Sequence, residues 1–106
     1  MEDTYFVVKF FAFADRGPYS IADLQEFECP QRYDAVEDAR FVAEYWMRYG
    51  FFRCVRCDKR IEASNGLITC AAVFYAQKLD GDVVWRRREN GRWTEWPKEE
   101  IKWGLR

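Results

Sequence analysis

The chain has 106 residues, a length typical of one folded domain, and 49% of them are hydrophobic, enough to build a single core. Its formal net charge is −1 and it contains no histidine, which excludes a Ser-His-Asp triad, a Cys-His pair and the His-based zinc-protease helix. No apolar run approaches the roughly 18 residues that would span a bilayer, and the first residues, MEDTYFVVKFF, lack the basic region and cleavage site of a signal peptide. We therefore expect one cytoplasmic, non-catalytic domain over residues 1–106.

The first clear pattern is TYFVVKFFAFA, residues 4–14. Its aromatic and β-branched residues favour a strand, both alternating faces are largely apolar, and the sequence DRGP ends it with a turn. The pattern predicts a long strand in the interior of a sheet. After the turn, Ser20 is placed to cap a short helical turn through IADLQEF.

An acidic stretch follows the first strand. Residues 15–44 carry eight acidic residues against three arginines. Such runs are usually solvated faces, and the alternative is an acidic binding surface. The residues that would form its centre are Asp23, Glu26 and Glu28.

The sequence DAVEDARFVAEYWMRYG predicts the main helix. Asp34 is placed to cap its first turn, with Glu37 at the capping-box position, and Gly50 suits a left-handed residue just past its end. One apolar face is expected to pack on the sheet: the stripe Ala35, Ala39, Val42, Trp46 and Tyr49, flanked by Val36, Ala43 and Met47. The opposite stripe is expected to be solvated and paired along the helix: Glu37, Arg40, Glu44 and Arg48.

The second half of the chain reads as strands and turns. Residues 51–57 predict a short strand, 58–66 a polar loop ending in Asn-Gly, and 67–79 a long strand. Asp80-Gly81 and Asn90-Gly91 each predict a two-residue hairpin turn, which makes 67–96 a three-stranded meander. Residues 97–106 are expected to form one helical turn. The predicted fold is α+β, with one amphipathic helix packed on an antiparallel sheet in the order β-α-(β)-β-β-β.

Two-residue turns fix the register of the meander, and the register sorts its residues into two faces. One face is expected to lie in the core: Ile68, Cys70, Ala72, Phe74, Ala76, Val83, Trp85 and Trp96, with Arg87 as the misfit. On the other face Arg86 lies opposite Glu95 and Arg88 is expected to stack on Trp93. The candidate binding residues on this second face are Tyr75, Arg86, Arg88 and Trp93.

Four cysteines allow a zinc site. Cys54 and Cys57 form a C-x-x-C, which with Cys29 and Cys70 would give four thiolate ligands. Half of a zinc signature is a weak indication, and Cys70 falls on the predicted core face, where a thiol is a common filler. Free thiols and no cofactor are the expectation, with zinc as the alternative.

Three functions compete for the Arg/Trp-rich hairpin. Trp, Tyr and Arg favour protein interfaces, aromatics with arginines also suit a nucleic-acid strand, and a solvated hairpin is the simplest interpretation. In size, element order, the acidic helix DAVEDARFVAE and the turn-rich DGDVVWRRRENGRWTEW, the chain resembles small phage accessory proteins such as anti-CRISPR proteins. The resemblance implies a non-catalytic inhibitor or adaptor that docks on a protein, without cofactor or small-molecule substrate. The alternative is a small nucleic-acid binder.

Overall fold

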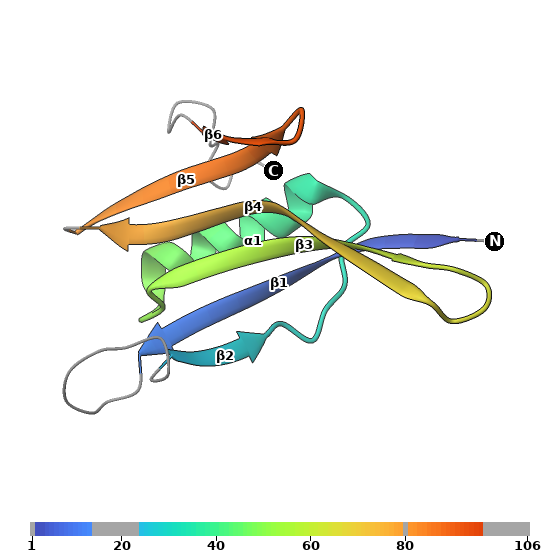
Figure 1. Ribbon diagram of the computed structural model, residues 1–106. Coiled ribbons are helices and arrows are strands. Elements are labelled where there is room, and N and C mark those ends of the chain that lie inside the picture. The colour runs from blue at the N-terminus through green and yellow to red at the C-terminus, as the bar shows by residue number, and fades with distance from the viewer. Residues whose placement is uncertain (1, 14–23, 80, 97–106) are drawn as a thin grey trace.

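The computed structural model describes residues 2–13, 24–79 and 81–96. These residues form one helix and a six-stranded antiparallel sheet in the order β2-β1-β3-β4-β5-β6 (Figure 1), which confirms the α+β class. The elements are β1 Asp3–Phe13, β2 Leu24–Glu28, α1 Val36–Tyr49, β3 Cys54–Glu62, β4 Ile68–Leu79, β5 Asp82–Glu89 and β6 Arg92–Glu95.

Strand β1 lies inside the sheet, between β2 and β3, as its two apolar faces predicted. The expected helical turn over 21–27 is wrong from Leu24 onward, since these residues form β2. An isolated helical turn fixes several dihedrals for one hydrogen bond, whereas beside β1 the segment gains a ladder that pairs Phe27 with Phe10. Ser20 and Asp23 lie outside the described residues.

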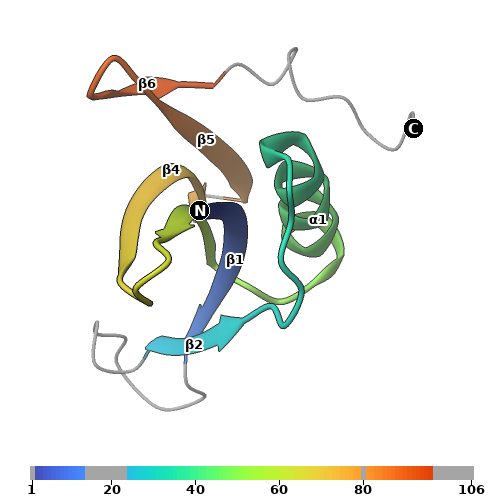
Figure 2. The same cartoon turned by 90° about the vertical axis from the view of Figure 1, so that its right-hand side faces the viewer.

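Helix α1 packs on one side of the sheet (Figure 2), with a face that is rotated from the predicted stripe toward its flank at Ala43 and Met47. Its buried residues are Ala39, Ala43, Glu44 and Met47, while Trp46 and Tyr49 are 45% and 67% exposed. The small side chains let the helix approach the sheet closely, and the bulky aromatics turn outward. The expectation of a solvated stripe is wrong at Glu44, which is buried and paired with Arg40 at 3.3 Å.

Both expected helix caps are also wrong. Ala35 is the N-cap residue, and no side chain caps the helix. Gly50 is extended, with φ −92° and ψ 178°, so a left-handed conformation is not the reason for glycine there. A Cβ at this position would lie 2.6 Å from the Trp46 carbonyl oxygen, and this close approach of helix backbone explains the residue.

The β3–β4 hairpin is longer than expected. Most of the predicted polar loop 58–66 is strand, and the turn is confined to 63–67, where Gly66 has φ 87°. The 14 residues of α1 extend about 21 Å, whereas the 12 residues of β4 extend about 40 Å. The end of the hairpin therefore projects past the helix (Figure 1). A β-bulge at Val73, where Cys57 pairs with Phe74 but Asp58 pairs with Ala72, moves Ile68 and Cys70 to the sheet face opposite that of Phe74, so both are exposed and not in the core.

The meander has the predicted register. Tyr75 pairs with Arg86 across β4 and β5, and Arg88 pairs with Trp93 across β5 and β6. The core beneath it includes Phe74, Ala76, Trp85 and Trp96, as expected. The predicted helical turn over 97–106 lies outside the described residues. Within the described ranges, no helix is long and apolar enough to cross a membrane.

Candidate functional site

The four hairpin residues expected to bind a partner lie on the sheet face that α1 does not cover, called here the open face. The Tyr75 and Trp93 rings meet edge to face at 4.8 Å, and the Arg88 guanidinium lies 5.5 Å from the centre of the Trp93 ring. The predicted stacking of Arg88 on Trp93 is therefore confirmed. Arg86 on β5 pairs with Tyr75 on β4 and with Glu95 on β6, but no ion pair joins the Arg86 and Glu95 side chains. We call Tyr75, Arg86, Arg88 and Trp93 the Arg/Trp face.

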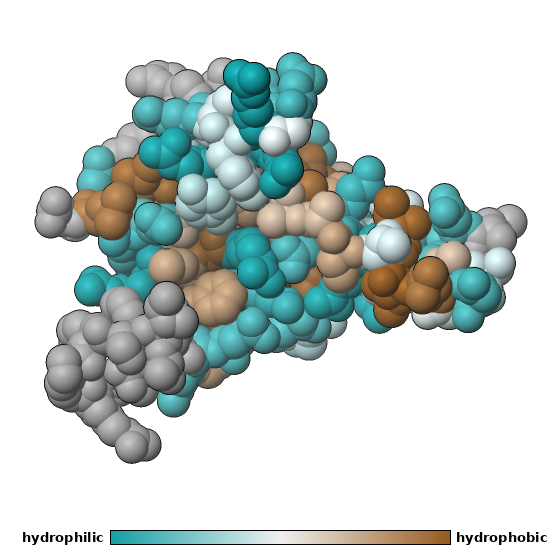
Figure 3. Space-filling model, in the orientation of Figure 1, coloured by the Kyte–Doolittle hydropathy of each residue, from teal (hydrophilic) through white to brown (hydrophobic). Residues whose placement is uncertain are grey.

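A charge network occupies the β2 side of the open face. Lys9 lies 4.0 Å from Glu26 and 3.8 Å from Glu28, and Arg60 donates to Glu28 at 3.1 Å. The two glutamates are half-exposed, and the cations that neutralise them are in the same sheet. Figure 3, which shows this face, has hydrophilic and weakly hydrophobic patches side by side over the middle of the sheet, and strong hydrophobic colour at the end of the β3–β4 hairpin. The expected acidic surface is thus internally compensated at Glu26 and Glu28.

The outward side of α1 carries large aromatic side chains that the sequence pattern placed elsewhere or left unassigned. Each is at least 38% exposed, and Phe51 just past the helix reaches 73%. The Tyr45 ring contacts the rings of Trp46 and Tyr49 at 5.2 and 5.1 Å, and Phe51 lies 4.9 Å from Phe52. We call this set the aromatic surface: Phe41, Tyr45, Trp46, Tyr49 and Phe51.

An apolar cavity of about 230 Å³ continues the aromatic surface toward β2. It lies between Trp46 on the helix and Phe27 on β2, with Phe10 and Phe52 in its wall. Phe10 and Phe52 stack at 4.7 Å. The aromatic surface therefore has a concave edge as well as an exposed face.

A sequence signal for this arrangement did exist. The positions of Ala39, Ala43 and Met47 follow a four-residue spacing, which marks the narrow side of the helix that fits close to a sheet. The aromatic residues at 41, 45 and 49 follow the same spacing on the other side. Because both stripes are apolar, hydrophobicity alone does not choose between them, and side-chain size was the deciding property.

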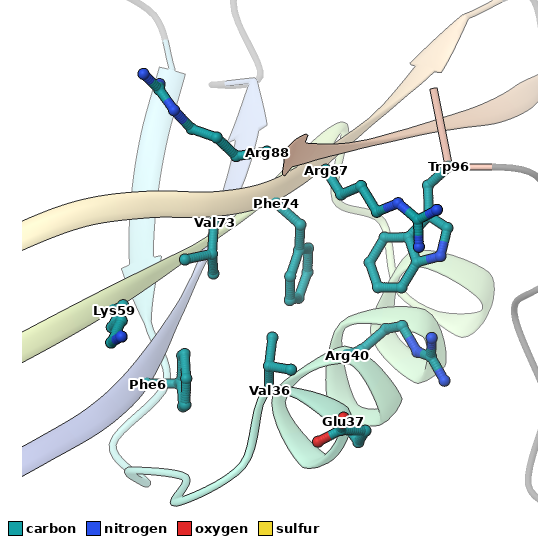
Figure 4. A pocket seen from close by; sticks show the side chains of 10 residues that line it. All are labelled: Phe6, Val36, Glu37, Arg40, Lys59, Val73, Phe74, Arg87, Arg88 and Trp96. Atoms are coloured by element: carbon teal, nitrogen blue, oxygen red, sulfur yellow. The ribbon is translucent and has the colours of Figure 1, made fainter. Parts of the chain in front are cut away.

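A larger cavity of about 470 Å³ lies between the sheet and the first turns of α1 (Figure 4). Its apolar walls come from Phe6, Val36, Val73, Phe74 and Trp96, and its charged lining residues are Glu37, Arg40, Lys59, Arg87 and Arg88. Figure 4 shows Arg88 pointing away from the other lining side chains.

The arginines that stay near this cavity are used within the protein. The guanidinium groups of Arg40 and Arg87 lie 4.8 and 5.5 Å from the centre of the Trp96 ring. Arg87 also pairs with Glu89 at 3.0 Å, which explains how this misfit residue is accommodated beside the core. Of the described residues that line the cavity, Glu37 is the one carboxylate, so the lining supplies no pair of carboxylates for general acid–base catalysis.

The cysteines do not assemble the proposed zinc site. Cys54 and Cys57 lie three positions apart on β3 and so project to opposite faces, with Cys57 in the core. Burial raises the pKa of the Cys57 thiol to about 12 and also raises the pKa of Cys54, which keeps both protonated at neutral pH. The described residues contain no group of three or more metal-ligating side chains. Cys29 is instead next to Tyr33, 3.4 Å from its hydroxyl.

Comparison of the chain with protein-family models, with curated proteins and with solved structures finds no match.

Proposed function

We propose that the protein is a non-catalytic inhibitor or adaptor that docks on other protein chains through the aromatic surface of α1. The single observation that carries this proposal is the exposure of five aromatic side chains on and just after one helix, of which Tyr45, Trp46 and Tyr49 are in ring contact. Isolated exposed apolar residues are ordinary, but a contiguous group of them is typical of an interface.

The composition of the aromatic surface supports a protein partner in particular. Tyr and Trp are the residues enriched at binding hot spots because they bury a large area at a small entropic cost. Arg48, whose guanidinium lies 6.0 Å from the centre of the Tyr49 ring, adds the third residue type typical of such sites. The adjoining cavity beside Trp46 is large enough to accept an apolar side chain of a partner.

The open face is a weaker candidate for the same role. Glu26 and Glu28 already have Lys9 and Arg60 as partners, so a protein that bound there would have to compete with ion pairs inside the sheet. Removing such charges from water without better partners is unfavourable. The aromatic surface requires no comparable polar desolvation.

Affinity capture with two baits tests this proposal. In extract of the organism that encodes the chain, wild-type bait is expected to retain a protein that a Tyr45→Glu bait does not retain. Mixing the purified partner with wild type should then give a complex of fixed stoichiometry. Identical proteins on the two baits would contradict docking through the aromatic surface. Arg92→Glu, a charge change on the exposed Arg92 of β6, is the matched control.

Nucleic-acid binding through the Arg/Trp face is the second candidate. It is favoured by one observation: among the described residues, neither Arg86 nor Arg88 forms an ion pair, and Tyr75 and Trp93 are beside them. Free cations and stacking rings are what a single strand requires. A tryptophan-fluorescence titration with single-stranded DNA and RNA at several salt concentrations tests it. Binding that weakens steeply with salt and is lost in Trp93→Ala supports this function, and no response at low salt eliminates it.

A further inference from the structure

We infer that the protein chain that covers the aromatic surface is a second copy of this chain, with the two α1 helices antiparallel across a two-fold axis on the outward side of the helix, midway between Phe41 and Tyr45. The inference rests on the proposed function, because it names the partner of the same surface. It follows from the order of side chains along the outward side of α1 and from the charges at its two ends.

The outward side of α1 has an apolar centre and charged ends. Phe41 and Tyr45 occupy the middle, 38% and 46% exposed. Glu37 and Asp38 lie in the first turn, and Arg48 lies in the last. Since side chains three and four positions apart share one side of a helix, these residues form a continuous strip. The buried residues Ala39, Ala43 and Met47 mark the opposite side, against the sheet.

This order is complementary to itself when it is reversed. In an antiparallel pair centred midway between Phe41 and Tyr45, Phe41 of one copy faces Tyr45 of the other, and the same contact occurs twice by symmetry. Arg48 of each copy then lies beside Glu37 and Asp38 of the other. A parallel pair would instead place acid against acid and arginine against arginine. The charges therefore select both a second copy and its direction.

The position of the helix makes the two-fold assembly consistent with the rest of the fold. Helix α1 lies on one side of the sheet (Figure 2), whereas Tyr75 and Trp93 lie on the open face. Two copies joined through α1 would leave both Arg/Trp faces uncovered and directed outward. Such a dimer would present two identical surfaces to a further partner, which raises affinity for any target with repeated sites.

Sedimentation velocity of the full chain between about 1 and 200 µM, a range chosen to bracket ordinary homodimer affinities, tests the inference. Wild type is expected to be a dimer that dissociates on dilution. Arg48→Glu should be monomeric because the new carboxylate would face Glu37 and Asp38, and Glu37→Lys with Asp38→Lys should be monomeric because both new cations would face Arg48. An equimolar mixture of these two variants restores opposite charges at both ends and should form a heterodimer. Arg92→Glu on β6 serves as the control and should remain dimeric.

The mixture distinguishes a charge effect from misfolding. Two variants that were monomeric because they misfold would not form a heterodimer when mixed. A wild-type monomer at every concentration would overturn the inference, and so would a dimer that Arg48→Glu and Tyr45→Glu leave unchanged. Neither result touches the proposed function, which fails separately if wild-type and Tyr45→Glu baits retain the same proteins.

Discussion

The aromatic surface of α1 and the charge network of the open face are both accessible to solvent. Only in the charge network do the exposed groups have partners of opposite charge within the fold. On the open face, Glu28 is half-exposed and has Lys9 and Arg60 beside it. On the helix, the ring neighbours of Tyr45 are Trp46 and Tyr49, which are just as exposed. Charged groups are stable at a surface because water and ion pairs satisfy them, whereas exposed rings gain free energy only when another chain covers them. Exposure by itself therefore does not identify a binding surface.

The largest expected effect is on the free energy of unfolding, and it comes from an ion pair that is buried under α1. Arg40→Ala removes one ion-pair partner of Glu44, which is 1% exposed, and should lower the free energy of unfolding by up to about 3–5 kcal/mol. Arg60→Ala removes a partner from the half-exposed Glu28 and should cost less than about 1 kcal/mol. Urea unfolding of the two variants checks this, and equal losses would contradict the distinction between a buried and a solvated pair.

The next prediction separates binding from stability. Tyr45→Ala should weaken binding at the aromatic surface by about 2 kcal/mol or more, which is roughly a 30-fold rise in Kd, because truncation of a hot-spot ring has effects of this size. The free energy of unfolding should change by less than about 0.5 kcal/mol, as for other exposed positions. Isothermal titration with the captured partner measures the first quantity and urea unfolding the second. Trp93→Ala is the comparison, and its Kd should stay near that of wild type.

A smaller effect is expected where the aromatic surface meets β3. Gly50→Ala should cost about 1–3 kcal/mol, because its Cβ would lie 2.6 Å from the Trp46 carbonyl oxygen and the end of α1 would have to shift. Gly66→Ala has no atom within 4 Å of the added Cβ, so only the positive φ of 87° opposes it. Thermal unfolding of the two variants compares a steric cause with a conformational one. A larger loss for Gly66→Ala would show that the contact at Gly50 relaxes freely.

The buried Cys57 thiol predicts that the stability of the protein depends on pH. The pKa of the Cys57 thiol is about 12 in the folded protein, because of burial, against an ordinary value of 9.0. The folded state holds this proton more tightly than the unfolded state. The stabilisation of the fold by the protonated thiol is therefore fully present below about pH 9 and is lost as pH rises toward 12. At pH 10 the loss is about 1.4 kcal/mol. Wild type should therefore lose stability relative to Cys57→Ala between pH 8 and 10, and parallel pH profiles would contradict the assignment.

Local signals in the sequence predicted the meander well and the helix only in part. Two-residue turns at Asp80-Gly81 and Asn90-Gly91 fix every pairing from Phe74 to Glu95 by counting, so the contact of Trp93 with Arg88 followed. The position of α1 in the sequence followed from its 3.6-residue pattern. The rotation of α1 about its own axis did not follow from the sequence. Two apolar stripes compete to face the sheet, and which one does so depends on how closely the helix backbone must approach the sheet.

Two other errors have a common physical origin. The polar sequence from Asp58 to Glu62 was expected to be a loop, and Glu44 was expected to be solvated, because charged residues usually mark the surface. In the structure Asp58 is held by Arg56 at 3.1 Å and Glu44 by Arg40 at 3.3 Å. Each partner is two or four positions away, at the spacing that places both side chains on one face of a strand or helix. Pairs of opposite charge at these spacings allow a strand or a buried helix face to contain ionised residues.

The most direct test of the central claim is photo-crosslinking with benzoylphenylalanine placed at Tyr45 or, in a separate chain, at Tyr75. Irradiation in cells is expected to join the Tyr45→benzoylphenylalanine chain to another protein chain, either a second copy or a different protein, at high yield. The Tyr75 variant, on the open face, should give much less product. Strong crosslinking from position 75 and none from position 45 would contradict the claim that the aromatic surface of α1 is where this protein binds others.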